Sequence, residues 1–216
     1  MCGGCHLEAP GQMVHFERYV AGGAMAKQIR IIIGNVSDRP QRPFGQWTKG
    51  YTQGELDSAQ ERFDLVFPPD LIALLRDRRP LDGHDWSDEA AIRQALGWPF
   101  EGLLASVERG SLWWPEWGER PATPDERKDV LWSVLSRAPK LIPLLGHRYL
   151  PEQPHEAGNP IFSVFGWDTI YYGADLADYF EREFAGFPFR PLREPIKYIP
   201  FWSDLVRRAT ERRIAP

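Results

Sequence analysis

Five side chains between residues 147 and 175 are of types that could do chemistry: His147, His155, Ser163, Asp168 and Asp175. Histidine and aspartate bind metals and exchange protons, and a serine beside a histidine–aspartate pair can act as a nucleophile. The spacing of the two histidines, however, fits no helical or hairpin ligand motif, and Ser163 lacks the glycine frame of a nucleophile elbow. We therefore predict no catalytic residue and no metal ligand. A small hydrolase or metal enzyme that uses His147 and Asp168 remains an alternative.

A second chemical pattern occurs at the N-terminus. Cys2-Gly3-Gly4-Cys5-His6 matches the C-x-x-C-H attachment motif of c-type haem. Haem attachment of this kind requires export, and the first residues lack the charged region and continuous apolar run of a secretory signal. We expect no haem and no other cofactor, and at most opportunistic metal binding by an exposed tail.

Aromatic and basic residues form two further groups. Trp113, Trp114 and Trp117 lie in a segment rich in tryptophan, which favours either a core or lid cluster or a platform for a partner. His147-Arg148-Tyr149 is either a strand-end cluster that binds loop carbonyls or a partner contact. Interfaces concentrate their binding energy in Trp, Tyr and Arg. The predicted partner-binding residues are Trp113, Trp114, Trp117, His147, Arg148, Tyr149 and His155.

Composition limits the classes of protein to consider. The 216 residues suit one domain, and an apolar fraction of 43% is enough for a core. The net charge of −4 argues against a dedicated nucleic-acid binder, which would carry a basic excess. No run approaches the roughly 18 apolar residues of a membrane helix. We expect a cytoplasmic protein that binds neither membrane nor nucleic acid directly.

The elements that would position these residues follow from periodicity and end signals. Residues 1–24 are expected to be a disordered extension, and residues 25–216 a single domain whose proline-rich and helical C-terminal extension covers 187–216. Thr123, Pro124 and Glu126 form the clearest helix start, a capping box with proline in the first turn. Strands are predicted at 29–33, 140–145, 147–150, 161–165 and 168–172. Helices are predicted at 55–63, 71–79, 85–96, 124–137, 175–185 and 201–213.

Short turns join the strands between 140 and 172, so these strands must be antiparallel neighbours. Along 161–165, Ile161 and Ser163 alternate with Phe162 and Val164, which predicts two different sheet faces. The expected fold class is therefore α+β, a mostly antiparallel meander with helices packed against it.

Several segments together resemble a known family. The motifs are FPPDLIALL at 67–75, LGWPFEG at 96–102, LWWPEWGERP at 112–121, APKLIPLLGHRYLP at 138–151 and GNPIFSVFGWDTIYYGADLADYF at 158–180. This arrangement is similar to the SUKH superfamily, and more narrowly to bacterial homologues of Smi/Knr-type cell-wall regulators. The resemblance covers roughly residues 55–184, and Phe67 stands where the family usually has leucine.

The resemblance implies an α+β fold, no catalytic residues and no universal set of ligand residues. Many bacterial members are immunity proteins that neutralise a cognate toxin, often a nuclease, and fungal members are interaction modules in cell-wall signalling. The first hypothesis is therefore a non-enzymatic protein-binding module of the immunity or antitoxin type. A regulatory interaction scaffold without a toxin is the second.

Overall fold

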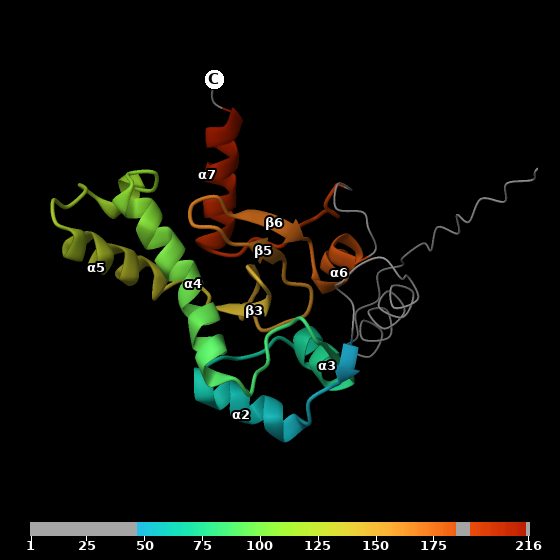
Figure 1. Ribbon diagram of the computed structural model, residues 1–216. Coiled ribbons are helices and arrows are strands. Elements are labelled where there is room, and N and C mark those ends of the chain that lie inside the picture. Colours follow the sequence, from blue (N-terminus) through green and yellow to red (C-terminus); the bar gives the residue numbers. More distant parts are fainter. Residues whose placement is uncertain (1–46, 185–190, 215–216) are drawn as a thin grey trace, which may run out of the picture.

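The computed structural model describes residues 47–184 and 191–214. It is an α+β fold with two antiparallel sheets, one of two strands and one of four (Figure 1). The N-terminal extension, its C-x-x-C-H motif and the strand expected at 29–33 lie outside the described residues. The helices are α2 (Gln53–Phe63), α3 (Pro69–Asp77), α4 (Glu89–Glu108), the 3₁₀ helix η1 (Pro115–Trp117), α5 (Pro124–Leu135), α6 (Leu176–Phe184) and α7 (Trp202–Ile214). The strands are β1 (Trp47–Lys49), β2 (Arg78–Pro80), β3 (Leu141–Leu145), β4 (Arg148–Pro151), β5 (Ile161–Ser163) and β6 (Ile170–Gly173).

The N-terminal part of the described chain forms the small sheet and two helices. Strand β1 pairs with β2 where the sequence predicted a loop and the end of a helix. Helix α3 therefore ends at Asp77, two residues earlier than predicted. Both strands have only three residues, too few for alternation to be visible in the sequence. Helix α2 begins with an unpredicted capping box, in which the Thr52 hydroxyl oxygen accepts from the Glu55 backbone N–H and the Glu55 carboxylate accepts from the Thr52 backbone N–H.

Helix α4 begins four residues later than the helix predicted at 85–96 and ends twelve residues later, because Gly97 and Pro99 lie inside it. A proline cannot donate to the carbonyl four residues earlier, so Pro99 leaves the Ala95 carbonyl free. The Tyr149 hydroxyl donates to that carbonyl at 2.8 Å. The helix thus continues through a proline because strand β4 satisfies the carbonyl that the proline leaves unbonded.

The four-stranded sheet has the predicted order β3-β4-β5-β6, each strand antiparallel to the next. Successive side chains along its strands point to opposite faces, and this alternation divides the core into two clusters. Ile142, Leu150 and Ile161 join the cluster built with α2, α3 and α6. Leu141, Tyr149 and Phe162 join the cluster built with α4, α5 and α7. Helices therefore cover both faces of the sheet (Figure 1).

The link from β5 to β6 lies against α4. Gly166 has φ 60°, and a Cβ there would meet the Ser106 Oγ at 2.6 Å and the Gly102 carbonyl oxygen at 2.7 Å. The Ser106 Oγ accepts the Trp167 backbone N–H at 3.1 Å. This close backbone contact requires glycine. It places Phe165 beside Trp98 of α4, with ring centroids 6.1 Å apart, and leaves Trp167 facing α7.

Helix α7, the helical part of the predicted C-terminal extension, contributes directly to the core. Trp202 and Leu205 are buried in the second cluster, as is Phe201 immediately before the helix. Phe201 has φ 66°, a left-handed conformation at which the chain turns into α7. The Trp202 indole also donates to the Pro139 carbonyl at 2.8 Å. The C-terminal segment is thus part of the domain, and it forms one wall of the site described next.

Candidate functional site

Residues 111–117 connect α4 to η1 and carry three tryptophans. The indole of Trp113 donates to the Gly118 carbonyl at 2.9 Å and meets the Trp117 ring edge-on at 5.4 Å. Trp114 lies 5.1 Å from Trp117 on its other side. All three are half-buried, so the segment is a packed aromatic cluster with an exposed edge. The packing agrees with the core-cluster interpretation drawn from the sequence, and the platform interpretation stays a prediction.

Trp114 faces helix α7. Its ring lies 5.2 Å from that of Phe201, and the Arg208 guanidinium lies over it at 4.4 Å. Arg208 also pairs with Glu116 at 2.6 Å, and this bond lowers the pKa of the Glu116 carboxyl. A cation on an aromatic face and a neighbouring carboxylate thus hold the tryptophan segment against α7.

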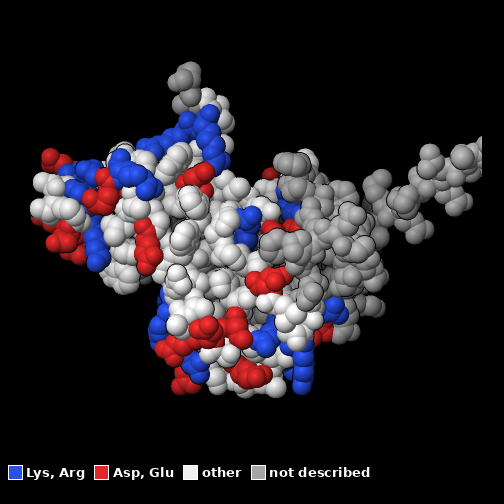
Figure 2. Space-filling view, in the orientation of Figure 1, with Lys and Arg blue, Asp and Glu red and all other residues white. Residues whose placement is uncertain are grey.

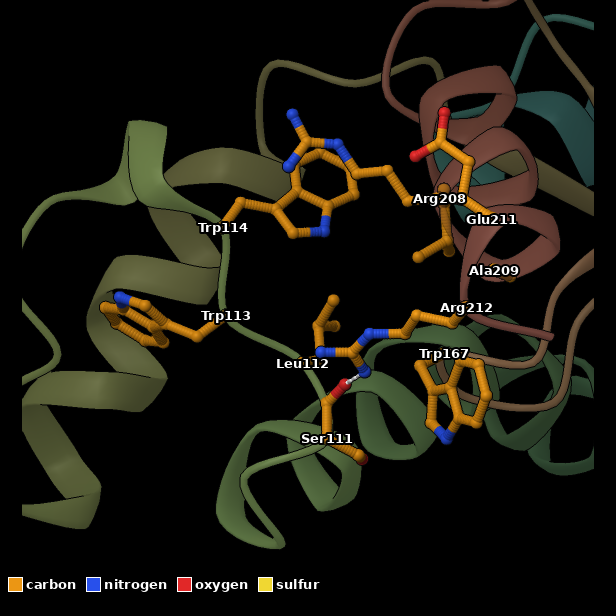
Figure 3. A pocket seen from close by; sticks show the side chains of 10 residues that line it. Ser111, Leu112, Trp113, Trp114, Trp167, Arg208, Ala209, Glu211 and Arg212 are labelled. Atoms are coloured by element: carbon orange, nitrogen blue, oxygen red, sulfur yellow. Dashed lines mark hydrogen bonds between the residues drawn. The ribbon is translucent and has the colours of Figure 1, made fainter. Parts of the chain in front are cut away.

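A cleft of about 330 Å³ opens between the tryptophan segment and helix α7 (Figure 3). In Figure 3, Trp114 and Arg208 stack at one end, Arg212 lies between Leu112 and Trp167 at the other, and the Trp113 indole points away from α7. Arg212 donates to the Ser111 carbonyl, and its guanidinium lies 5.6 Å from the Trp167 ring centre. The lining residues are Ser111, Leu112, Trp113, Trp114, Trp167, Leu205, Arg208, Ala209, Glu211 and Arg212.

The arginines of α7 are mostly paired. Arg207 binds Asp204 and Glu211 at 3.3 and 3.2 Å, and Arg213 binds Asp168. Figure 2 shows basic side chains gathered over the C-terminal end of α7. The partners of Arg207 lie on α7 itself, whereas Asp168 lies between β5 and β6, so it is Arg213 that ties the basic end of the helix to a neighbouring segment.

A second arginine site lies on strand β4. Arg148 donates to the Ser163 hydroxyl at 2.7 Å, lies 3.6 Å above the Tyr172 ring and pairs with Glu183 at 3.7 Å. Its side chain is 16% exposed, and that of Glu183 19%. Partial burial, followed by the charge of Arg148, lowers the pKa of His147. The surroundings of Arg148 are those of a structural ion pair.

The predicted partner-binding residues consequently do not form one surface. Tyr149 is only 1% exposed, so predicting it as a contact residue was wrong: alternation in β4 turns it into the core. His155 is exposed, and its Nε2 lies 3.2 Å from the Phe67 carbonyl, next to α3. Arg148 contacts β5, β6 and α6, whereas Trp114 contacts α7.

The side chains of the alternative enzymatic hypothesis engage other groups. Asp168 pairs with Arg213, His147 contacts Arg148, and Ser163 accepts from Arg148. No hydrogen bond joins His147 to Asp168 or to Ser163 within the part of the chain that the structure describes. The same residues include no group of three or more His, Cys, Asp and Glu side chains placed to hold a metal ion.

The sequence interpretation missed the α7 wall of the cleft. Arg208 and Arg212 are four residues apart, and Leu205 and Ala209 follow the same spacing. Such residues share one helix face. This spacing was available in the sequence, but nothing in it indicated that the face would meet Trp114 and Trp167.

No protein-family model, no curated protein and no solved structure matches this chain. Among residues 47–184 and 191–214, no helix combines the length and apolar character needed to cross a bilayer.

Proposed function

We propose that this protein is a non-enzymatic protein-binding module, and that the cleft between the tryptophan segment and α7 is its partner-binding site. The observation that carries the proposal is the composition of the cleft. Trp114, Trp167 and two arginines converge there from three segments, and the first and last of these meet in the Arg208–Glu116 pair, 92 positions apart in sequence. These are the side chains that dominate binding energy at protein interfaces.

The partner we propose is a protein toxin, which this protein would neutralise in the cytoplasm. What supports a toxin as the partner is the resemblance of residues 55–184 to the SUKH superfamily, many of whose bacterial members are immunity proteins. A regulatory interaction scaffold of the cell-wall-signalling type would use the same cleft. The immunity and scaffold hypotheses therefore differ in what the bound partner does.

The first experiment captures the partner and tests the site. The full chain is immobilised and incubated with lysate of its native host at low salt, and the captured protein is purified and titrated by calorimetry. We expect Trp114→Ala to weaken the affinity at least about tenfold, as removal of an interface hot spot does. The matched control is Trp132→Ala, the same change at a tryptophan of α5 that is 62% exposed and remote from the cleft lining.

The second experiment tests what the partner does. The captured protein is expressed alone and together with this chain, and growth of the cells is followed. Immunity predicts that the partner alone arrests growth, and that co-expression restores it with the wild-type chain but less well with Trp114→Ala. A partner that is harmless alone would favour the scaffold. Unchanged affinity for a folded Trp114→Ala variant would reject the cleft as the binding site.

A further inference from the structure

Arg212 differs from the other arginines of α7. Arg207, Arg208 and Arg213 each pair with a carboxylate. Arg212 lines the cleft, donates to the Ser111 carbonyl and lies near the Trp167 ring. No carboxylate among the described residues lies within ion-pair distance of its guanidinium. Arginine has five N–H donors in a planar fork, which suits a carboxylate.

The rest of the cleft narrows the chemistry of the ligand. Its floor includes the buried side chains of Leu112, Leu205 and Ala209, which would cover an apolar group. Acidic groups surround it: Glu211 in the lining, Glu116 on Arg208 and Asp168 on Arg213. Each is paired with an arginine of α7, Glu211 with Arg207, so among the described residues Arg212 is the arginine of α7 left for a ligand carboxylate. A single guanidinium suits one carboxylate rather than a polyanion such as a nucleic-acid backbone.

From these observations we infer that the cleft binds a peptide segment of a protein partner in which one aspartate or glutamate lies next to a large apolar side chain. The carboxylate accepts from the Arg212 guanidinium, and the apolar side chain packs on the floor between Trp114 and Trp167. The inference rests on the proposed function and adds the kind of segment recognised. It assigns to Arg212 the role of selecting for an acidic residue.

The test selects peptides on the full chain. A phage-displayed library of random heptapeptides is selected on immobilised wild-type protein and on Arg212→Gln. We expect the wild-type protein to enrich peptides with an acid beside Phe, Leu, Met or Trp, and Arg212→Gln to lose the acidic preference while retaining the apolar one. Arg212 is exposed near the end of α7, so its substitution is expected to preserve folding, which circular dichroism checks.

A double-mutant cycle then tests for direct contact. The most enriched peptide is labelled with fluorescein and compared with its Glu→Gln or Asp→Asn form on both proteins by anisotropy. Removing either partner should weaken binding about tenfold, and removing the second should add little, because a charge-assisted hydrogen bond is lost only once. Arg212→Lys, which keeps the charge but not the fork, should fall between the two.

Four results would overturn the inference: no enriched peptide, enrichment without an acid, additive effects in the cycle, or Arg212-dependent binding of a labelled oligothymidylate instead. Such a failure is distinguishable from failure of the proposed function. If Trp114→Ala still abolishes capture of the partner, the cleft binds a protein by other chemistry. If peptide selection succeeds but partner affinity is insensitive to Trp114→Ala, the cleft has a ligand other than that partner.

Discussion

Arg148 and Arg208 each lie over an aromatic ring beside a glutamate, yet they belong to different kinds of site. Arg148 covers Tyr172 at 3.6 Å and pairs with Glu183, and both side chains of this pair are less than one-fifth exposed. Arg208 covers Trp114 at 4.4 Å and pairs with Glu116, which is 62% exposed. The motif is the same, and the difference lies in access to water.

Access to water distinguishes an ion pair that stabilises the fold from one whose partners water or a ligand can replace. A buried charge that loses its partner is left without compensation, and this is costly. An exposed pair contributes little, because water screens both charges and replaces either partner easily. Arg148 therefore serves the fold, whereas the charges around Arg208 are free to form new pairs with the proposed partner. The predictions below test this contrast.

The largest effect is expected for Arg148→Ala. The variant leaves Glu183 in its half-buried position without this cation, and the Ser163 hydroxyl without its donor. We expect a loss of about 3 kcal/mol in the free energy of unfolding, measured by urea titration. Partner affinity of the folded fraction should change little.

Arg93→Ala is the matched control for this prediction. Arg93 also pairs with a glutamate, Glu89, and lies over a ring, that of Phe63. Its side chain is 59% exposed, so its removal should hardly affect the urea midpoint. Equal losses in the two variants would show that burial does not distinguish these pairs.

A smaller loss of stability is expected for Tyr149→Phe. This variant removes the donor to the Ala95 carbonyl, which Pro99 cannot replace. Leaving a buried carbonyl unsatisfied should cost about 1–2 kcal/mol in urea titrations. Tyr198→Phe is the control. The Tyr198 hydroxyl donates to Asp204, but Tyr198 is 59% exposed, so water can replace this bond. If both variants were equally stable, strand β4 would not be supporting α4 through this bond.

The same tyrosine makes stability depend on alkaline pH. Burial raises the pKa of Tyr149 above the ordinary value of 10.0. Above that pH the unfolded chain releases the proton while the folded protein retains it, so stability falls as pH rises, by up to about 1.4 kcal/mol per unit. Tyr149→Phe should flatten this decline, measured by urea titrations between neutral pH and pH 11. An identical slope in both proteins would contradict the assignment.

The contrast between the two arginines also explains how far the sequence could be interpreted. The α+β class, the meander and the alternation of Ile161 and Phe162 were all predictable, because period and turn signals are local. The continuation of α4 through Pro99 was not, because the compensating hydroxyl belongs to Tyr149, 50 positions later. Glycine and proline both disfavour a helix interior by local propensity, and at Gly97 and Pro99 a tertiary contact overrides that propensity.

The candidate site was predictable in composition but not in location. The residue types at Trp114 and Arg148 indicated interface anchors for both, and only burial shows that Arg148 serves the fold. The α7 wall depends on contacts such as that between Arg208 and Glu116, which are 92 positions apart. The periodicity of one segment cannot predict a contact between residues so far apart in the sequence. The surface that faces a partner is set by which long-range pairs form.

The smallest change in stability is expected for Arg208→Ala, at the exposed pair. Its guanidinium leaves the Trp114 face and the Glu116 carboxylate, but water replaces it at both. The melting temperature should therefore remain close to that of the wild-type protein at low and high salt, while partner affinity falls through loss of a cation at the cleft. Differential scanning calorimetry and partner titration on the same sample measure both quantities. A melting temperature lowered as far as in Arg148→Ala would mean that Arg208 also serves mainly the fold, and the distinction between the two arginines would disappear.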